Sequence, residues 1–531
     1  STDATVWVET DQRCEVDVLG RTAATFEVEG HHFAIVAIRG LHPGTHAYQV
    51  ALNGRVVWPD PGSDLPPSLI RTLDADEIDL AFGSCRVTAP HEAAAAGPGN
   101  DQHQGCGIDA LRALAMRMVH TAPAAWPDCL LLLGDQVYAD EVSPQTARSI
   151  AAQRDTSAPH ADEVANFEEY THLYREAWQE PTVRWMLSNV GTTMLWDDHD
   201  VHDDWNISQA WLEHARAQPW WAQRITGALM SYWLYQHIGN LSPAELEADA
   251  LLAAVRGADD GGATLRAFAN EVANDGVGPR WSIRRDFGRT RLVGLDCRAG
   301  RVLTPGARSM LSEADWRWFE QQADGDFDHL LVAVSTPYLL TPALHHLESW
   351  SEAVCDGAWG RAMAALGERV RQAIDLDHWA AFRHSFERLT DMLCRAGEGQ
   401  GTGRPASIVV LSGDIHSGSV SELVFPIASA ARAPTYQIVS SPLRNSLGRW
   451  ERRALKIAGS TPAAWFGRAL LATVGLKPPR VRWHNLAGPW FDNHISTIQV
   501  RARQISVRVE RAVHAEPGRA DLALVTAQRL A

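Results

Sequence analysis

Basic residues are scarce in this chain, and lysine is almost absent. Only Lys456 and Lys477 are lysines among 531 residues, so nearly all the basic charge is arginine, for which genomic base composition is a sufficient explanation. Basic residues number 48 against 64 acidic ones, a net charge of −16. An acidic protein attracts neither nucleic acid nor an anionic membrane surface, so the bulk composition disfavours both classes of partner.

Cysteine and long apolar runs are also lacking. The seven cysteines are scattered without CxxC spacing, which excludes a disulfide framework and a zinc finger. No segment reaches the roughly 18–20 apolar residues of a membrane span. Reduced thiols, and an N-terminus (STDATVWVE) without a signal-peptide pattern, favour a cytoplasmic location. The alternative is that an export signal was removed from a longer precursor. The sequence does not indicate the oligomeric state.

The N-terminal part is typical of a small β-sandwich. Two strand-like runs flank Asn53-Gly54, a pair that favours a two-residue hairpin because both positions accept positive φ. The segment LHPGTHAYQV resembles a fibronectin type III pattern, with Tyr48 placed like a tyrosine-corner residue. A proline-rich linker follows. We therefore predict an N-terminal β-sandwich domain over residues 1–73.

The rest of the chain, residues 74–531, has the pattern of an α/β domain. Short apolar strands alternate with longer helical segments. These strands are the runs IDLAFGS, CLLLLGD, TTMLWDD, RLVGLDC, HLLVAVSTP, SIVVLSGD and YQIVSSP. Helix-rich insertions are expected at about residues 145–190, 207–275 and 345–400, and TIQVRARQISVRV predicts a C-terminal hairpin.

Four of these strands end on residues of metal-binding type. The residues are Cys85, then Asp135 and Tyr138, then Asp198 and His199, and finally Asp414 and His416. Ligands in open α/β sheets gather at the carboxyl ends of strands, so one metal site is expected there. A tyrosine phenolate suits Fe³⁺, whose charge lowers the phenol pKa. Taken singly, each motif has an ordinary alternative, such as an exposed acidic loop or a buried cysteine that packs as a hydrophobe.

Individual roles follow from the side-chain chemistry. Asp135 has two oxygens and could bridge two metals, and Asp198 is assigned to metal binding. His199 is a candidate acid or transition-state stabiliser, while Asp200 and Asp203 are possible supporting groups or calcium ligands.

Two arginines at strand ends have open roles. Arg86 follows Cys85, and Arg298 follows the LDC strand end. Either could clamp phosphate through a bidentate contact, and for each the alternative is a structural ion pair.

The motifs FGSCR, GDQVYAD, WDDHDVHDDW, LDCR and SGDIHSG together resemble the alkaline phosphatase D (PhoD-like) family of calcineurin-like metallophosphoesterases, over most of residues 75–510. The resemblance implies an αββα sandwich, Fe³⁺ together with Ca²⁺ (other divalent metals being possible), and hydrolysis of phosphate mono- and diesters. It implies that iron is held by Cys85, Asp135, Tyr138, Asp414 and His416. It also implies that Asp135 and Asp198 face calcium, and that His199 matches the histidine after the metal-binding Asn of ordinary metallophosphatases.

The chain departs from the wider calcineurin-like pattern in ways that bear on the ligand set. Cys85 stands where Asp-x-His is usual and Asp198 where Asn is usual, and the PhoD-like branch shares both departures. Ser335-Thr336-Pro337 stands where a ligand histidine is often found, so no ligand is expected there. Asp140 and His202 leave the calcium ligands open.

The resulting hypothesis is a hydrolase of small-molecule phosphate esters, with water attack on phosphorus at an iron–calcium cluster. His199, Arg298 and Arg86 are its candidate catalytic residues. Two alternatives are a non-catalytic scaffold that uses the β-sandwich and a different iron enzyme on the same fold. The sequence contains no readable substrate motif.

Overall fold

The computed structural model of the protein describes residues 2–73, 77–90, 106–275, 278–399, 403–426, 432–516 and 518–531. The domain boundary predicted at residues 73–74 adjoins residues 74–76, which lie outside the described residues. The first nine strands form three small antiparallel sheets, ordered β1-β5-β4, β3-β2-β7-β8 and β6-β9. Their bounds are β1 (Ala4–Thr10), β2 (Glu15–Val18), β3 (Arg21–Ala24), β4 (Phe26–Val28), β5 (His31–Ile38), β6 (Thr45–Tyr48), β7 (Val50–Leu52), β8 (Arg55–Trp58) and β9 (Ser68–Arg71).

The hairpin prediction in this region is confirmed, and the tyrosine-corner prediction is wrong. Leu52 pairs with Arg55, and Asn53 and Gly54 have φ of 49° and 81°. The Tyr48 hydroxyl donates to the backbone carbonyl of Ser188 at 2.6 Å, whereas a tyrosine corner bonds to backbone a few residues upstream. Tyr48 therefore joins the N-terminal sheets to the remainder of the chain.

Two larger sheets follow, ordered β12-β11-β10-β20-β21-β22 and β13-β14-β15-β16-β18-β17-β19. The seven expected strands are present as β10, β11, β12, β14, β15, β16 and β18, and each pairs in parallel with another of them. The C-terminal hairpin is confirmed as β20 and β21, where Arg501 pairs with Gln504. The bounds are β10 (Glu77–Gly83), β11 (Cys129–Leu133), β12 (Gly191–Leu195), β13 (Ile283–Phe287), β14 (Thr290–Leu295), β15 (His329–Val334), β16 (Ser407–Ser412), β17 (Gly418–Val424), β18 (Thr435–Val439), β19 (Arg482–Trp490), β20 (His494–Arg501), β21 (Gln504–Glu516) and β22 (Arg519–Arg529).

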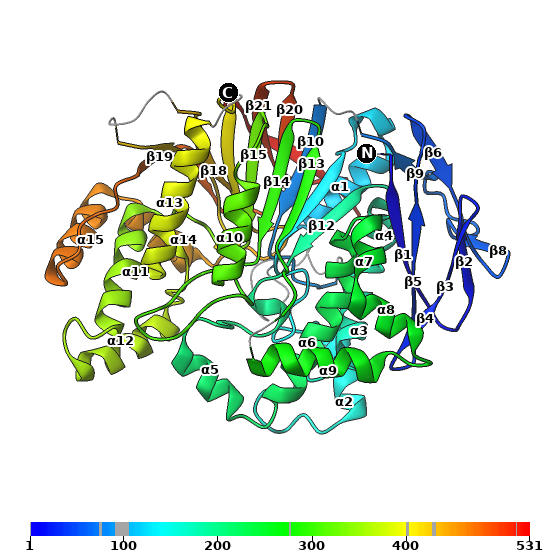
Figure 1. The fold of residues 1–531 in the computed structure, drawn as a ribbon, viewed down its shortest axis with the longest axis horizontal. Coiled ribbons are helices and arrows are strands. Elements are labelled where there is room, and N and C mark those ends of the chain that lie inside the picture. Colours follow the sequence, from blue (N-terminus) through cyan, green and yellow to red (C-terminus); the bar gives the residue numbers. More distant parts are fainter. Residues whose placement is uncertain are drawn as a thin grey trace.

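The two sheets pack face to face, with helices on their outer faces (Figure 1). Leu131 of β11 and Leu331 of β15 belong to the same buried cluster between the sheets. Successive side chains on a strand point to opposite faces. Leu130 accordingly packs with α1 (Ala110–Val119), and Val332 packs with α10 (Glu313–Gln322) and α13 (Arg383–Glu398). This arrangement is the predicted αββα sandwich.

The three predicted insertions are helical, and their aromatic residues form core. Trp196 stacks on Tyr232 with ring centroids 4.1 Å apart, and Tyr174 stacks on Tyr235 at 4.4 Å, in a buried cluster that includes Phe33 of β5. Among the residues that the structure describes, no helix combines the length and apolar character needed to cross a membrane. The remaining bounds are η2 (Pro123–Ala125), α2 (Pro144–Gln153), α3 (Phe167–Trp178), α4 (Pro181–Leu187), η3 (Asp198–Asp200), α5 (Gln209–Arg216), α6 (Trp221–Tyr235), η4 (His237–Asn240), α7 (Pro243–Ala248), α8 (Ala250–Gly257), α9 (Gly262–Asp275), α11 (Pro342–Cys355), α12 (Arg361–Ala373), η5 (Trp379–Ala381), α14 (Arg449–Ala458) and α15 (Thr461–Thr473).

Candidate metal centre

Strands from both large sheets end at one place. β10 ends two residues before Cys85, β11 two before Asp135, β16 two before Asp414 and β12 three before Asp198. Because these strands run parallel to their neighbours, their carboxyl ends meet at one edge of the sandwich. The tertiary structure thus brings together motifs that lie more than three hundred residues apart in the chain.

Two glycines permit this close approach. A Cβ on Gly134 would lie 2.5 Å from the Cβ of Asp197, and one on Gly413 would lie 2.0 Å from the Oγ of Ser84. The first contact joins neighbouring strands of one sheet, and the second joins the ends of the two sheets. The glycine of each Gly-Asp pair is therefore required by packing.

Four of the six predicted metal ligands adopt left-handed backbone conformations. The φ angles are 56° at Cys85, 53° at Asp135, 70° at Asp414 and 47° at His416. Such angles are uncommon for residues with a Cβ, and each strained residue costs on the order of 1–3 kcal/mol. Strain of this kind persists where the surroundings over-determine it, and it clusters at functional sites.

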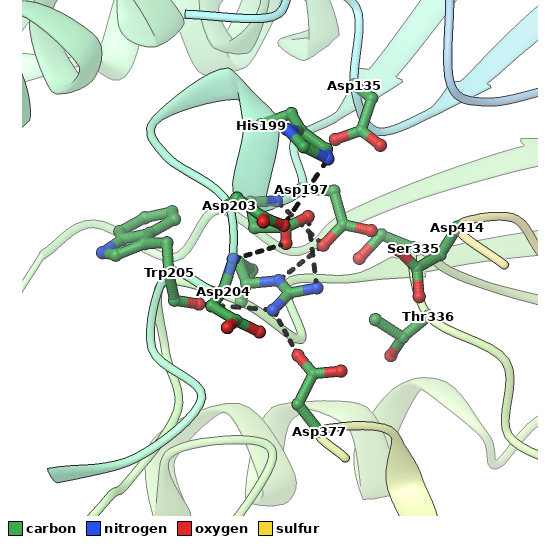
Figure 2. Close-up of polar contacts among 12 residues, drawn as sticks. Asp135, Asp197, His199, Asp203, Asp204, Trp205, Ser335, Thr336, Asp377 and Asp414 are labelled. Carbon is green, nitrogen blue, oxygen red and sulfur yellow. Dashed lines mark hydrogen bonds and ion pairs between the residues drawn. The ribbon is translucent and has the colours of Figure 1, made fainter. Parts of the chain in front are cut away.

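Four buried or half-buried carboxylates form what we call the carboxylate cluster: Asp135, Asp197, Asp198 and Asp414, with ligand oxygens within 4.8 Å of one another. Figure 2 shows three of them, Asp135, Asp197 and Asp414, converging on one region. Burial, reinforced by neighbouring carboxylates, raises the pKa of Asp135 and Asp197 well above the usual range, although His199 and Arg298 respectively oppose the shift. Asp135 Oδ1 and Asp197 Oδ2 are buried without a hydrogen-bond partner. Convergent, unpaired carboxylate oxygens fit a bound cation, which would neutralise this charge.

A thiol and a phenol flank the carboxylate cluster. Cys85 Sγ lies 3.3 Å from Asp135 Oδ2, and the Tyr138 hydroxyl lies 3.5 Å from the same oxygen. Burial, with the charge of nearby groups, raises the pKa of Cys85 and of Tyr138 well above ordinary values. Asn445 Nδ2 donates to the Tyr138 hydroxyl at 3.2 Å. Ionisation of either group here needs a compensating positive charge.

His416 belongs to the same electrostatic environment. Burial lowers its pKa to about 4, the charge of His199 adds to the effect, and Asp414 and Asp198 oppose it. A neutral imidazole is the form that binds metals.

His199 is held by a carboxylate that lies outside the cluster. Its Nδ1 lies 3.0 Å from both oxygens of Asp140, and its ring stacks on Tyr138 with centroids 4.4 Å apart. Burial lowers the pKa of His199, but the charge and hydrogen bond of Asp140 outweigh it and raise the pKa well above the usual value. Asp140 Oδ2 also accepts from the backbone N–H of Asp203 at 2.6 Å, which ties the two loops together.

Arg298 lies among the carboxylates of the centre and binds several of them. Its Nε donates to Asp197 Oδ1 at 2.5 Å, and another guanidinium nitrogen donates to Asp377 Oδ2 at 2.5 Å. A third nitrogen lies 3.5 Å from Asp198 Oδ1, and the side chain is fully buried. Through these contacts Arg298 holds the carboxylates of Asp197 and Asp377 in place.

Arg86 has the contacts of a structural ion pair, which was the alternative to its predicted role as a phosphate clamp. Its Nε and one guanidinium nitrogen donate to Asp109 Oδ2 at 3.0 and 2.8 Å, and the other donates to the carbonyl of Ala177 at 2.8 Å. Asp109 also caps α1 by accepting from the backbone of Arg112. With each guanidinium nitrogen hydrogen-bonded and the side chain buried, Arg86 fastens α1 to α3.

The third insertion contributes residues that sequence reasoning missed. His378 Nε2 lies 2.9 Å from Asp414 Oδ2, and Asp377 accepts from both Arg298 and Arg301. Both residues precede or begin η5, away from any strand end. The local signal for them is the short run DLDH, which contains two aspartates and a histidine. This run does not follow a strand, so a search of strand ends does not find it.

Comparison with known proteins finds a related family for part of the chain. Residues 106–249 match the sequence model of the PhoD-like phosphatase family. This part of the chain is therefore similar to the PhoD-like phosphatases. Residues 1–70 match a domain of unknown function, DUF7800. The PhoD-like match makes the protein a phosphoric ester hydrolase, and the donor set is that of a metal-dependent one.

A solved structure of PhoD shows that this chain shares its fold. A structure of PhoD superposes with a TM-score of 0.55 at 13% identity, covering 98% of this chain and 86% of that chain. A structure of purple acid phosphatase PPD1 from yellow lupin (Lupinus luteus) seeds has a TM-score of 0.44 at 10% identity, covering 96% and 70% of the two chains. A search of curated proteins gave no match.

Proposed function

We propose that this PhoD-like protein hydrolyses phosphate esters at a centre that holds Fe³⁺ together with Ca²⁺. The observation that carries the proposal is the carboxylate cluster, with unpaired oxygens, beside Cys85 and Tyr138. Carboxylates alone would suit many cations. A thiol and a phenol on the same carboxylate oxygen favour a trivalent ion with affinity for both.

The two metals would be held by different parts of the centre. Cys85, Tyr138 and His416, with Asp135 and Asp414, would hold iron. Asp135 and Asp198 would face calcium, which prefers oxygen ligands. Asp197, absent from the sequence-derived set, brings a further carboxylate whose Oδ1 is fastened by Arg298.

The residues around the centre have separable roles in hydrolysis by water. Cations bound there would supply Lewis acidity toward the phosphoryl oxygens and would make water a better nucleophile. His199, with Nδ1 held by Asp140, would give the Nε2 proton to the leaving oxygen. Arg298 keeps Asp197 and Asp377 in place, and its positive charge offsets the local excess of carboxylate.

The test combines metal content, colour and turnover in protein purified without a metal-affinity tag. We expect iron near one equivalent with calcium, a visible phenolate-to-iron band, and hydrolysis of nitrophenyl phosphate or bis(nitrophenyl) phosphate. Tyr138→Phe should lose the band, whereas Tyr174→Phe should retain it. Tyr174 is an equally buried phenol whose hydroxyl accepts from Gln236, so it controls for loss of a buried phenol.

Two outcomes would contradict the proposal in different ways. Active protein that contains zinc or manganese without iron would overturn the metal assignment and leave the reaction. Folded protein that stays inactive on both esters after iron and calcium are restored would overturn the reaction itself.

A further inference from the structure

Residues 449–482, which we call the basic segment, carry a charge opposite to that of the whole chain. The segment comprises α14, α15 and the stretch that leads into β19. It contains a single acidic residue, Glu451, and eight basic ones: Arg449, Arg452, Arg453, Lys456, Arg468, Lys477, Arg480 and Arg482. Eight positive charges less one negative charge give the segment a net charge of +7. The whole chain has a net charge of −16, so the rest of the chain carries −23. Both lysines of the protein lie here.

The same segment exposes large apolar side chains. Among the described residues, the four most exposed large hydrophobics are Trp450 at 78%, Ile457 at 68%, Trp465 at 67% and Phe466 at 66%. Four on two consecutive helices, joined by Gly459-Ser460, mark an interaction surface, since isolated exposed apolar residues would be scattered.

The arrangement of each helix keeps these side chains in solvent. Trp450 and Ile457 are seven residues apart, so they lie two turns apart on one face of α14. The Arg453 guanidinium lies 4.9 Å from the Trp450 ring centroid, on that same face. In α15, Gly467 and Leu471 are buried, with Gly467 close to His346 of α11, while Trp465 and Phe466 remain exposed.

We propose that the basic segment docks on an anionic phospholipid bilayer, with Trp450, Trp465 and Phe466 in the interface and the arginines and lysines among the headgroup phosphates. Amphipathic helices with basic residues and exposed tryptophan lie in this way at membrane surfaces. Each basic residue near an anionic leaflet contributes favourably, so the positive excess fits this surface. A symmetric contact with a second copy would instead place +7 against +7.

The proposal revises the expectation drawn from net charge, which disfavoured an anionic membrane. Association depends on the charge of the contacting face, and α15 lies at the end of the molecule away from the N-terminal sheets (Figure 1). Docking here would bring the centre close to the bilayer, because α14 begins four residues after Asn445, which bonds Tyr138. The proposal concerns attachment and is independent of the ester hydrolysed.

Sedimentation of the full chain with lipid vesicles tests the proposal. We expect binding to vesicles of phosphatidylcholine mixed with phosphatidylglycerol, little binding to phosphatidylcholine alone, and weakening by salt. The apolar variant Trp450→Ser/Trp465→Ser/Phe466→Ser and the charge variant Arg453→Glu/Lys456→Glu should each lower the affinity at least about tenfold.

Matched controls separate the surface from general effects. Leu366→Ser/Ile374→Ser removes exposed apolar groups on or next to α12, and Arg395→Glu reverses a charge on α13; both should bind like the parent. All variants should hydrolyse a soluble nitrophenyl ester at the parental rate, which shows that they are folded. Absence of binding to anionic vesicles, or equal loss in the controls, would overturn the proposal. So would a dimer in solution that the apolar variant abolishes, since it would assign the surface to a second copy.

Discussion

His378 Nε2 lies 2.9 Å from Asp414 Oδ2, and its Nδ1 lies 2.6 Å from Glu348 Oε1. Burial lowers the pKa of His378, but Glu348 and Asp414 outweigh burial and raise it well above the usual value. An imidazolium therefore links the end of β16 to α11. Since Glu348 and His378 both belong to the third insertion, that insertion is part of the centre.

The His378 bridge predicts a large loss of stability when it is removed. His378→Gln leaves the buried Glu348 and the half-buried Asp414 without their cation, and breaking a buried ion pair in this way costs about 3–5 kcal/mol. We expect the free energy of unfolding, measured by denaturant titration of metal-free protein, to fall by about 3 kcal/mol. The exposed His384→Gln on α13 is the control. Equal stability of the two variants would mean that the bridge contributes nothing.

Neutralising a member of the carboxylate cluster should separate function from folding. Asp135→Asn or Asp414→Asn removes the charge of a metal-binding carboxylate, so the protein should no longer retain metal. Turnover should drop by more than about 100-fold, the loss typical when a residue that only supports a metal ligand is replaced. The metal-free Asp135→Asn protein should unfold no more easily than the parent, because burial already disfavours the charged form of Asp135. Metal analysis, ester hydrolysis and thermal unfolding measure the three quantities, with exposed Asp155→Asn as control. Full activity in either variant would refute the ligand assignment.

The contact between Asp140 and His199 predicts a specific kinetic defect. Asp140→Asn removes the charge that holds His199 Nδ1, so the imidazole should be less well oriented and less often protonated. We expect kcat for a nitrophenyl ester to fall about 10–100-fold with KM nearly unchanged. A rise in KM with unchanged kcat would instead indicate that Asp140 contributes to substrate binding.

His31 predicts a pH-dependent contact between the N-terminal sheets and the first insertion. Its Nε2 lies 2.7 Å from Glu168 of α3 and its Nδ1 3.5 Å from Glu9 of β1. The hydrogen bond with Glu9 is the main cause that raises the pKa of His31; burial opposes it, and Glu168 adds to the rise. Because the folded pKa exceeds the unfolded value of about 6.5, the stabilisation is complete below that pH. It disappears as pH rises through the folded pKa.

Unfolding of the parent and of His31→Gln across about pH 5–9 measures this linkage. The parent should have a higher free energy of unfolding than the variant. This difference should be largest at acid pH and should become smaller as the pH rises. Exposed His42→Gln should show no such trend. A difference that grows toward alkaline pH would contradict the assignment of His31.

Local pattern predicted the strands and the residues at their ends. Cys85, Asp135, Asp198 and Asp414 could be found because a buried strand is a continuous apolar run, and the residue after it must emerge at the sheet edge. The Asn53-Gly54 turn was predictable for a similar reason, since its conformation depends on those two residues alone.

The amino-acid sequence by itself determined the α/β pattern, the helical insertions and the set of strand-end residues, because these depend on neighbours along the chain. Only the tertiary structure decided between Arg86 and Arg298, which have the same local setting. Arg86 meets Asp109 of α1, whereas Arg298 meets Asp197 and Asp377 within the centre. The contact between His378 and Asp414 is likewise known only from the tertiary structure. A buried ion pair is set by which elements pack together, and no pattern within a segment records the partner that another segment brings.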